Sequence, residues 1–150
     1  SVAISKQPAS NFTPETISPN SLKYPFAQLN LLIVDDVSMN CIILNALLKE
    51  LGVMHISEES NGADAVSKIK TNDNIDMILM DIRMPKMDGL EASKLIRELG
   101  YKKPIIAVTA NAFDEDKKAC LDAGMTDFLS KPIDINKLKD VLLRSLEQKQ

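Results

Sequence analysis

Short apolar runs alternate with segments of helical periodicity from Leu29 to the end of the chain. Each run has the length of a buried strand and is bounded by turn residues, whereas the intervening segments repeat apolar residues every three or four positions. The pattern predicts strands over 29–35, 55–59, 75–80, 105–108 and 127–129. It predicts helices between Ser38 and Gly52, over 63–71, between Gly89 and Gly100, over 113–123 and from Asp134 onward.

The first and last helices carry recognisable starting residues. Ser38 and Asp134 are the expected N-caps, because a short polar side chain there accepts a hydrogen bond from an otherwise unpaired backbone N–H of the first turn. In the first helix, one face is formed by Met39, Ile42, Ile43, Ala46 and Leu47. The last helix is expected to bury Ile135, Leu138, Val141 and Leu142. The helix over 113–123 differs, because its apolar stripe is thin and its polar face is dense, which predicts shallow packing.

Strands and helices that alternate through short connections predict an α/β protein with a parallel sheet covered by helices. Two doubly wound strand orders are common, and the pattern alone leaves both open. Both orders place a ligand site beyond the carboxyl ends of the strands.

Residues 1–28 differ from this folded part. They contain many Ser and Asn residues, no apolar periodicity, and the prolines Pro8, Pro14, Pro19 and Pro25. This composition predicts a linker or disordered arm before a folded domain over 29–147, with 148–150 as a tail.

Composition excludes several classes of function. The 150 residues carry a net charge of −3, which offers no basic field for nucleic acid. No apolar stretch approaches the roughly 20 residues that span a bilayer. His55 is the only histidine, and Cys41 and Cys120 are far apart, so a Ser/His or Cys/His catalytic pair is not expected.

Polar residues follow the apolar runs where the predicted strands end. Asp35 and Asp36 follow the first run, and Asp81, Thr109 and Lys131 follow three others. In a parallel sheet these ends meet at one edge. Two carboxylates about 5 Å apart repel by roughly 3 kcal/mol at an effective dielectric near 20, so this site needs a cation. Hard carboxylate oxygens favour Mg²⁺, with Mn²⁺ as the alternative.

The same edge is suited to phosphoryl chemistry. Lys131 offers a point charge and Thr109 a hydroxyl for phosphoryl oxygens. No Ser, Cys or His is placed to accept the group, so a carboxylate is the expected acceptor. Asp81, at the end of the middle strand and beside a loop, is the best candidate.

Four motifs in order, VDD, MDIRMPKMDG, VTANA and LSKP, resemble the receiver domain of two-component response regulators over about 29–146. The resemblance implies a flavodoxin-like (βα)5 fold with strand order 2-1-3-4-5. It also implies that Asp81 accepts a phosphoryl group from phosphohistidine. The implied Mg²⁺ ligands are Asp36, Asp81 and the backbone carbonyl of Arg83, with Asp35 acting through water.

The resemblance assigns further roles. Thr109 is the implied switch hydroxyl, Lys131 the phosphate partner and Phe128 the switch aromatic. The family tends to hold the bond between Lys131 and Pro132 cis. Arg83 and Asn111 flank the path of an attacking water, so both are expected to influence the lifetime of the phosphoryl group.

The wording of the motifs is most similar to receivers of hybrid sensor histidine kinases, although Val37 stands where these often carry Asn. The expected partners are a histidine kinase or a histidine-phosphotransfer domain, with no direct nucleic acid or membrane contact. A cytoplasmic monomer is expected, with a parent protein that could be anchored in a membrane. We expect a switch that catalyses only its own phosphorylation and dephosphorylation, with the helix over 113–123 and the strand over 127–129 as its output surface.

Three alternatives remain open. A free-standing single-domain regulator would carry the same motifs. An Mg²⁺-dependent phosphatase with an Asp nucleophile would resemble DxD on the first strand, whereas this chain has adjacent Asp35 and Asp36. A flavodoxin-like flavin protein would need a Ser/Thr/Gly-rich phosphate loop after the first strand, and DDVSMN is not one.

Overall fold

The computed structural model describes residues 26–71, 74–84, 87–110 and 114–148. Five parallel strands form one sheet in the order β2-β1-β3-β4-β5, so the flavodoxin-like order is confirmed. The strands are β1 (Asn30–Val34), β2 (His55–Glu59), β3 (Met77–Asp81), β4 (Ile105–Thr109) and β5 (Asp127–Ser130). The helices are α2 (Ser38–Glu50), α3 (Gly62–Thr71), α4 (Gly89–Glu98), α5 (Asp114–Asp122) and α6 (Ile135–Gln148).

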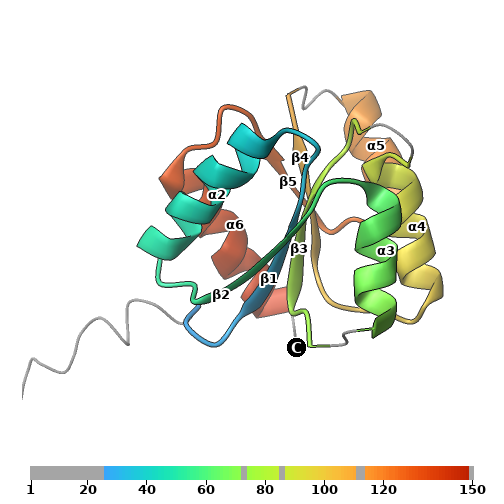
Figure 1. Cartoon of the computed structure of the whole chain (residues 1–150). Coiled ribbons are helices and arrows are strands. Elements are labelled where there is room, and N and C mark those ends of the chain that lie inside the picture. The colour runs from blue at the N-terminus through green and yellow to red at the C-terminus, as the bar shows by residue number, and fades with distance from the viewer. Residues whose placement is uncertain (1–25, 72–73, 85–86, 111–113, 149–150) are drawn as a thin grey trace, which may run out of the picture.

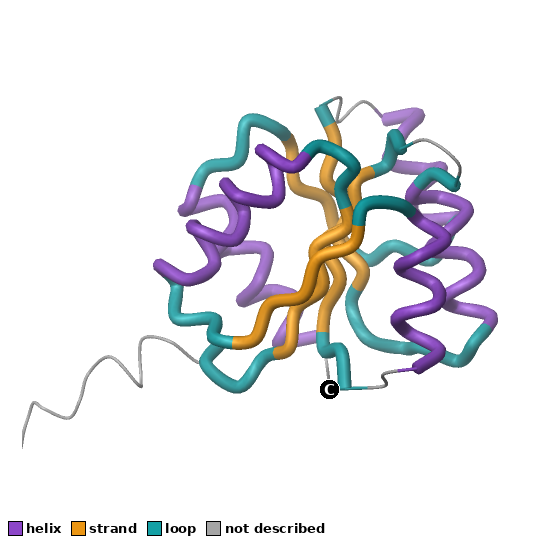
Figure 2. The backbone as a smooth tube through the Cα atoms, viewed as in Figure 1, coloured by secondary structure: helices purple, strands orange, loops and turns teal. Residues whose placement is uncertain are grey.

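Helices cover both faces of the sheet. Figure 1 shows α2 and α6 on one face, and α3, α4 and α5 on the other. Figure 2 shows the strands as a twisted layer between these two groups. Every residue of β3 and β4 is buried, because central parallel strands are covered on both sides. The apolar runs therefore predicted strands correctly, with boundaries that differ by at most two residues.

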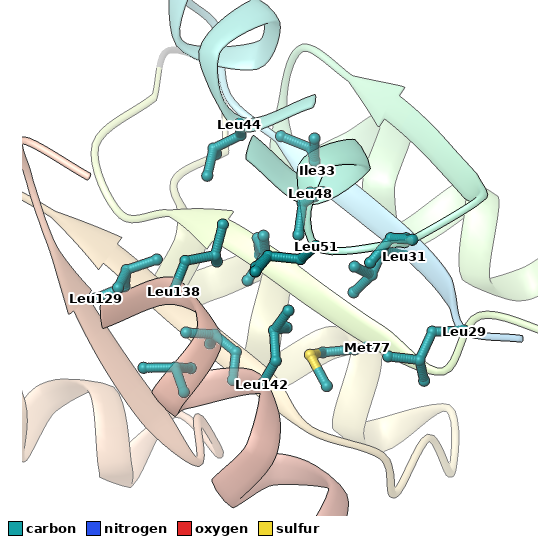
Figure 3. Close-up of a cluster of buried hydrophobic side chains, with 14 of the residues drawn as sticks. Leu29, Leu31, Ile33, Leu44, Leu48, Leu51, Met77, Leu129, Leu138 and Leu142 are labelled. Carbon is teal, nitrogen blue, oxygen red and sulfur yellow. The ribbon is translucent and has the colours of Figure 1, made fainter. Parts of the chain in front are cut away.

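Each face of the sheet has its own hydrophobic core. Under α2 and α6, side chains such as Leu31, Leu48 and Leu142 pack together with Met77 (Figure 3). The other core lies under α3, α4 and α5 and includes Ile78 and Ile96. Within the described residues, no helix is both long and apolar enough to cross a membrane.

The folded part includes a residue that the sequence pattern assigned to the arm. Phe26 has 0% of its surface exposed and belongs to the core under α2 and α6. Its carbonyl oxygen accepts a hydrogen bond from Leu29 N at 3.0 Å, which turns the chain into β1. The ordered body therefore includes Phe26 as well as the predicted start at Leu29.

Helix α2 corrects two expectations. Ser38 is the first helical residue rather than the N-cap, which is Val37 and makes no side-chain cap bond. The buried residues of α2 are Cys41, Leu44 and Leu48. The predicted apolar face lies largely in solvent instead, with Met39 60% and Ile42 59% exposed. The helix thus has one apolar side on the sheet and a second that faces outward.

The last helix follows its prediction closely. Asp134 directly precedes α6, and its carboxylate accepts a hydrogen bond from Asn136 N at 3.1 Å. Leu138, Val141 and Leu142 are buried and Ile135 is half-buried. A strong apolar stripe on a helix without a competing second stripe therefore predicted the buried side correctly.

The amino-terminal end of the sheet is closed by polar side chains. The carboxylate of Asp76, just before β3, accepts hydrogen bonds from Asn30 N at 3.0 Å and Lys103 Nζ at 3.1 Å. Arg97 donates to the carbonyl oxygens of Gly124, Tyr101 and Lys103 at 2.7–2.9 Å. These bonds tie β3, α4 and the turns before β4 and β5 together.

Candidate functional site

The carboxyl-terminal edge of the sheet brings three carboxylates together. Asp35 follows β1 directly, Asp36 is the next residue, and Asp81 ends β3. One carboxylate oxygen from each lies within 4.8 Å of the others. The sequence pattern predicted that these side chains would meet at one edge of the sheet. The structure brings them together because β1 and β3 are neighbouring strands.

Asp35 is the most enclosed of the three acids. It is 3% exposed, and its Oδ1 accepts a hydrogen bond from Val37 N at 2.9 Å. The buried Oδ2 atom has no hydrogen-bond partner, although Lys131 Nζ lies 3.5 Å away. A buried carboxylate oxygen without a hydrogen bond is costly, so this atom fits a site completed by a cation or its water.

Asp81 is buried as well, and its environment disfavours the ionised form. It is 7% exposed, with Lys131 Nζ 3.8 Å from Oδ1. Burial, followed by the negative charge of Asp35, raises the pKa of Asp81 to about 6. The charge of Lys131 and a hydrogen bond from the backbone of Arg83 act in the opposite direction.

The site therefore holds more negative charge than its own residues neutralise. Asp36 is exposed, whereas Asp35 and Asp81 are enclosed and share one ammonium group. Oxygen ligands in this arrangement suit Mg²⁺, which keeps several waters and needs only one or two direct carboxylates. The residues present fit such an ion.

The other predicted residues lie on the neighbouring strands. Thr109 ends β4 and is buried, and its carbonyl oxygen accepts a hydrogen bond from Lys131 N at 2.9 Å. Phe128 lies on β5 opposite Ala107 and packs, half-buried, against the core under α3, α4 and α5. The peptide bond between Lys131 and Pro132 is cis. Asn111 lies outside the described residues.

Sequence reasoning missed two contributors to the site. Cys41, on the buried side of α2, donates from Sγ to the carbonyl oxygen of Asp35 at 3.6 Å. Burial raises the pKa of this thiol to about 11, with smaller contributions from nearby carboxylates, so it stays neutral. Gly89 packs against the backbone of Asp81 so closely that a Cβ atom there would collide with the Asp81 carbonyl oxygen. The turn signal at Asp88 and Gly89 indicated a bend but not this contact.

Comparison with known proteins identifies the class. Residues 31–143 match the response regulator receiver domain family, and the chain belongs to that family. It is 42% identical over 119 residues to the osmosensing histidine protein kinase SLN1 of Saccharomyces cerevisiae. That match covers 76% of this chain and 10% of SLN1, so the chain spans about a tenth of this relative's length.

Two solved structures have the same fold. The receiver domain of sensor histidine kinase PA1611 from Pseudomonas aeruginosa, with magnesium in its active-site cleft, is 38% identical with a TM-score of 0.72. The match covers 81% of this chain and 99% of that one. The receiver domain of Saccharomyces cerevisiae Ssk1, solved with the phosphotransfer protein Ypd1, is 30% identical with a TM-score of 0.71. It covers 79% of this chain and 88% of the other. The chain is a receiver domain of a two-component phosphorelay, homologous to the receivers of hybrid kinases.

Proposed function

We propose that Asp81 accepts a phosphoryl group from a phosphohistidine donor, in a site completed by Mg²⁺. The observation that carries this proposal is the convergence of three carboxylate oxygens within 4.8 Å, beside the ammonium group of Lys131. In the transfer, an Asp81 oxygen forms the new P–O bond and the P–N bond of phosphohistidine breaks. The electron pair of that bond stays on the imidazole nitrogen, which takes up a proton.

Each neighbouring group has a separate task. Asp36, Asp81 and the carbonyl of Arg83 would hold the metal, and Asp35 would act through a bound water. When bound, Mg²⁺ supplies positive charge that keeps Asp81 ionised at neutral pH and offsets the charge of the incoming phosphoryl oxygens. Mn²⁺ has the same ligand preferences and is the alternative ion.

Lys131 and Thr109 report the phosphoryl group to the rest of the domain. Lys131 would bond one phosphoryl oxygen, and the Thr109 hydroxyl another. Movement of Thr109 would let Phe128 turn inward on β5 and alter the surface formed by β5 and α5. Helix α5 packs on the sheet through few side chains. Among its residues 117–122, Cys120 is buried, whereas Leu121 is 56% exposed. Arg83 and Asn111 would set how fast water removes the group.

The donor protein would dock on the outer apolar face of α2. Met39, Ile42 and Ile43 are exposed there, one side of the helix lies beside Asp36, and the other borders a cavity of about 210 Å³ next to Lys131. This face is continuous with the acceptor site, so a helix of a phosphohistidine-bearing protein seated on it would hold its imidazole near Asp81. We assign the face to a histidine-phosphotransfer domain or the histidine-bearing part of a kinase.

The acceptor is tested by intact mass after incubation with acetyl phosphate and Mg²⁺. One added phosphoryl group is expected, with none in Asp81→Asn and an unchanged yield in Asp76→Asn, at the other end of the same strand. Labelling that persists in Asp81→Asn contradicts the assignment. Sustained phosphate release from unrelated monoesters would instead favour a phosphatase, and a yellow purified protein would indicate a flavin.

The docking face is tested by comparing two phosphodonors. Ile42→Asn is expected to slow transfer from a phosphorylated histidine-phosphotransfer protein about tenfold or more, as for a central interface residue. Labelling by acetyl phosphate should be unchanged. Met54→Asn, which alters another exposed apolar residue away from α2, is the control. Equal effects of both variants would place the donor elsewhere.

The wider role follows from this chemistry. The domain would act as a cytoplasmic, monomeric switch that catalyses only its own phosphorylation and dephosphorylation. The parent would be a hybrid histidine kinase, and the alternative is a free-standing single-domain regulator. The sequence upstream of Ser1 in the gene distinguishes these two parents.

A further inference from the structure

Two glycines far from each other in sequence contact the described residues that follow Asp81, namely 82–84 and 87–88. Gly62, the first residue of α3, donates from its backbone N–H to the Met87 carbonyl oxygen at 3.2 Å. A Cβ atom at Gly62 would lie 2.5 Å from that same oxygen and 2.9 Å from Ala92 Cβ. Because ordinary contacts are longer, any side chain here would push the main chain of Met87 away from α3.

Gly89 holds the other side of the same segment. Its N–H donates to the Ile82 carbonyl oxygen at 2.8 Å, and Ile82 N donates to the Val108 carbonyl oxygen at 3.3 Å. The close packing of Gly89 on the Asp81 carbonyl leaves no room for a side chain. Arg83, whose backbone bonds to the Asp81 carboxylate, lies between these contacts.

The Gly62 contact is fixed from the side of α3. Asn61 is buried, its Oδ1 accepts from Asp64 N at 2.9 Å, and its Nδ2 donates to Asp64 Oδ2 at 2.9 Å. One turn further on, Ala65 and Val66 anchor the helix in the core. The start of α3 is therefore held by side-chain hydrogen bonds and core contacts, and the main chain at Met87 packs against it.

We infer that Gly62 and Gly89 are positioning residues, whose missing side chains seat residues 82–84 and 87–88 so that the Arg83 N–H faces the Asp81 carboxylate. The proposal rests on the proposed magnesium site, because the Arg83 carbonyl is one of its ligands. The two glycines would affect the affinity for the metal rather than the phosphoryl transfer itself. Groups that orient metal ligands typically change affinity by about 10- to 100-fold when altered.

Gly62→Ala is the main test, because Gly89→Ala also disturbs the acceptor's own backbone. The Mg²⁺ Kd, measured by calorimetry, is expected to rise about tenfold. The rate of labelling by acetyl phosphate should fall at low Mg²⁺ and return to the wild-type value at saturating Mg²⁺. Ser67→Ala, at an exposed position of the same helix, is the control for altered helix propensity and should change neither quantity.

A second measurement needs no metal. In EDTA, hydrogen exchange of the Arg83 and Gly89 amides should be faster in Gly62→Ala than in wild type and Ser67→Ala. The double variant Gly62→Ala/Met87→Ala should behave like Gly62→Ala, because the clash involves the Met87 main-chain oxygen. Full rescue by Met87→Ala, or unchanged exchange and Mg²⁺ affinity in Gly62→Ala, overturns the proposal.

These results separate the two levels of inference. If Gly62→Ala changes amide hydrogen exchange and Mg²⁺ affinity but wild type is never labelled on Asp81, the positioning role of the glycines is right and the proposed acceptor is wrong. If wild type is labelled and Gly62→Ala is indistinguishable from it at every Mg²⁺ concentration, the acceptor stands and the positioning role is wrong.

Discussion

Strand β3 ends on Asp81 and is directly preceded by Asp76, and these two aspartates lie in opposite electrostatic surroundings. Asp76, before the strand, receives a backbone N–H and the ammonium of Lys103, both within 3.1 Å. Asp81, at the other end, faces the carboxylate of Asp35 and has Lys131 no closer than 3.8 Å. The same residue type thus serves stability at one end and is left under-compensated at the other. Excess charge that the fold does not neutralise indicates where a ligand is expected.

The largest stability effect is expected at the satisfied end. Arg97→Met should lower the free energy of unfolding by about 3 kcal/mol or more, because three carbonyl oxygens lose a charged donor. These acceptors are the carbonyls of Gly124, Tyr101 and Lys103. Urea denaturation measures the loss. Acetyl phosphate labelling of the folded fraction should stay unchanged, and a selective loss of labelling would contradict the separation between the two ends.

The next effect has the opposite sign. Asp81→Asn should raise the free energy of unfolding at pH 7 in EDTA by roughly 2–3 kcal/mol. Folding raises the pKa of Asp81 from its ordinary value of 3.8 to about 6, so the contribution of the protonated carboxyl to stability is fully present below about pH 3.8. That contribution is lost as the pH rises through 6. Urea denaturation at pH 3.5 and 7 tests this, since a gain of equal size at both values would exclude ionisation as its cause.

A smaller loss is expected when the carboxylate of Asp76 is removed. Asp76→Ala should cost about 1–2 kcal/mol, because the backbone N–H of Asn30 loses its acceptor at a partly buried position. Thermal unfolding in EDTA measures this loss. Asp81→Ala should not destabilise the metal-free protein. Equal losses of stability in Asp76→Ala and Asp81→Ala would therefore contradict the electrostatic difference between these two aspartates.

The smallest effect is expected for Lys103. Its side chain is 36% exposed, so Lys103→Met should cost less than about 1 kcal/mol. Salt should reduce the difference from wild type, because exposed pairs are screened. Denaturation at 50 mM and 1 M NaCl measures it. A cost that is large and independent of salt would show that Lys103 acts by packing instead.

Periodicity predicted the α/β class and the meeting of the strand ends at one edge, whereas the strand order followed from the resemblance to receiver domains. The runs before Asp35, Asp81 and Thr109 mark strands, and parallel strands bring their carboxyl ends together. The burial of individual side chains was harder to predict from the sequence. Two apolar stripes on α2 compete, and only packing against the sheet decides that Leu44 and Leu48 are buried while Ile42 is exposed.

Other features depended on contacts between distant segments. Phe26 lies among prolines and polar residues, so nothing local distinguished it from the arm, yet it fills the core beside Leu29. The contact of Gly62 with Met87 joins residues from two different strand–helix connections. A turn signal records only the local bend, whereas this contact exists only after the sheet has formed.

The placement of Phe26 also determines how this domain can be joined to others. The chain enters the fold before β1, and α6 returns toward the same amino-terminal end of the sheet (Figure 1). Fusion partners attached at either end would leave from the side opposite Asp81. Fusions at both ends would therefore leave the acceptor edge open to an incoming protein. A fusion in which the partner replaces the residues up to and including Phe26 would remove a buried aromatic ring. The free energy of unfolding would then fall by roughly 3–5 kcal/mol.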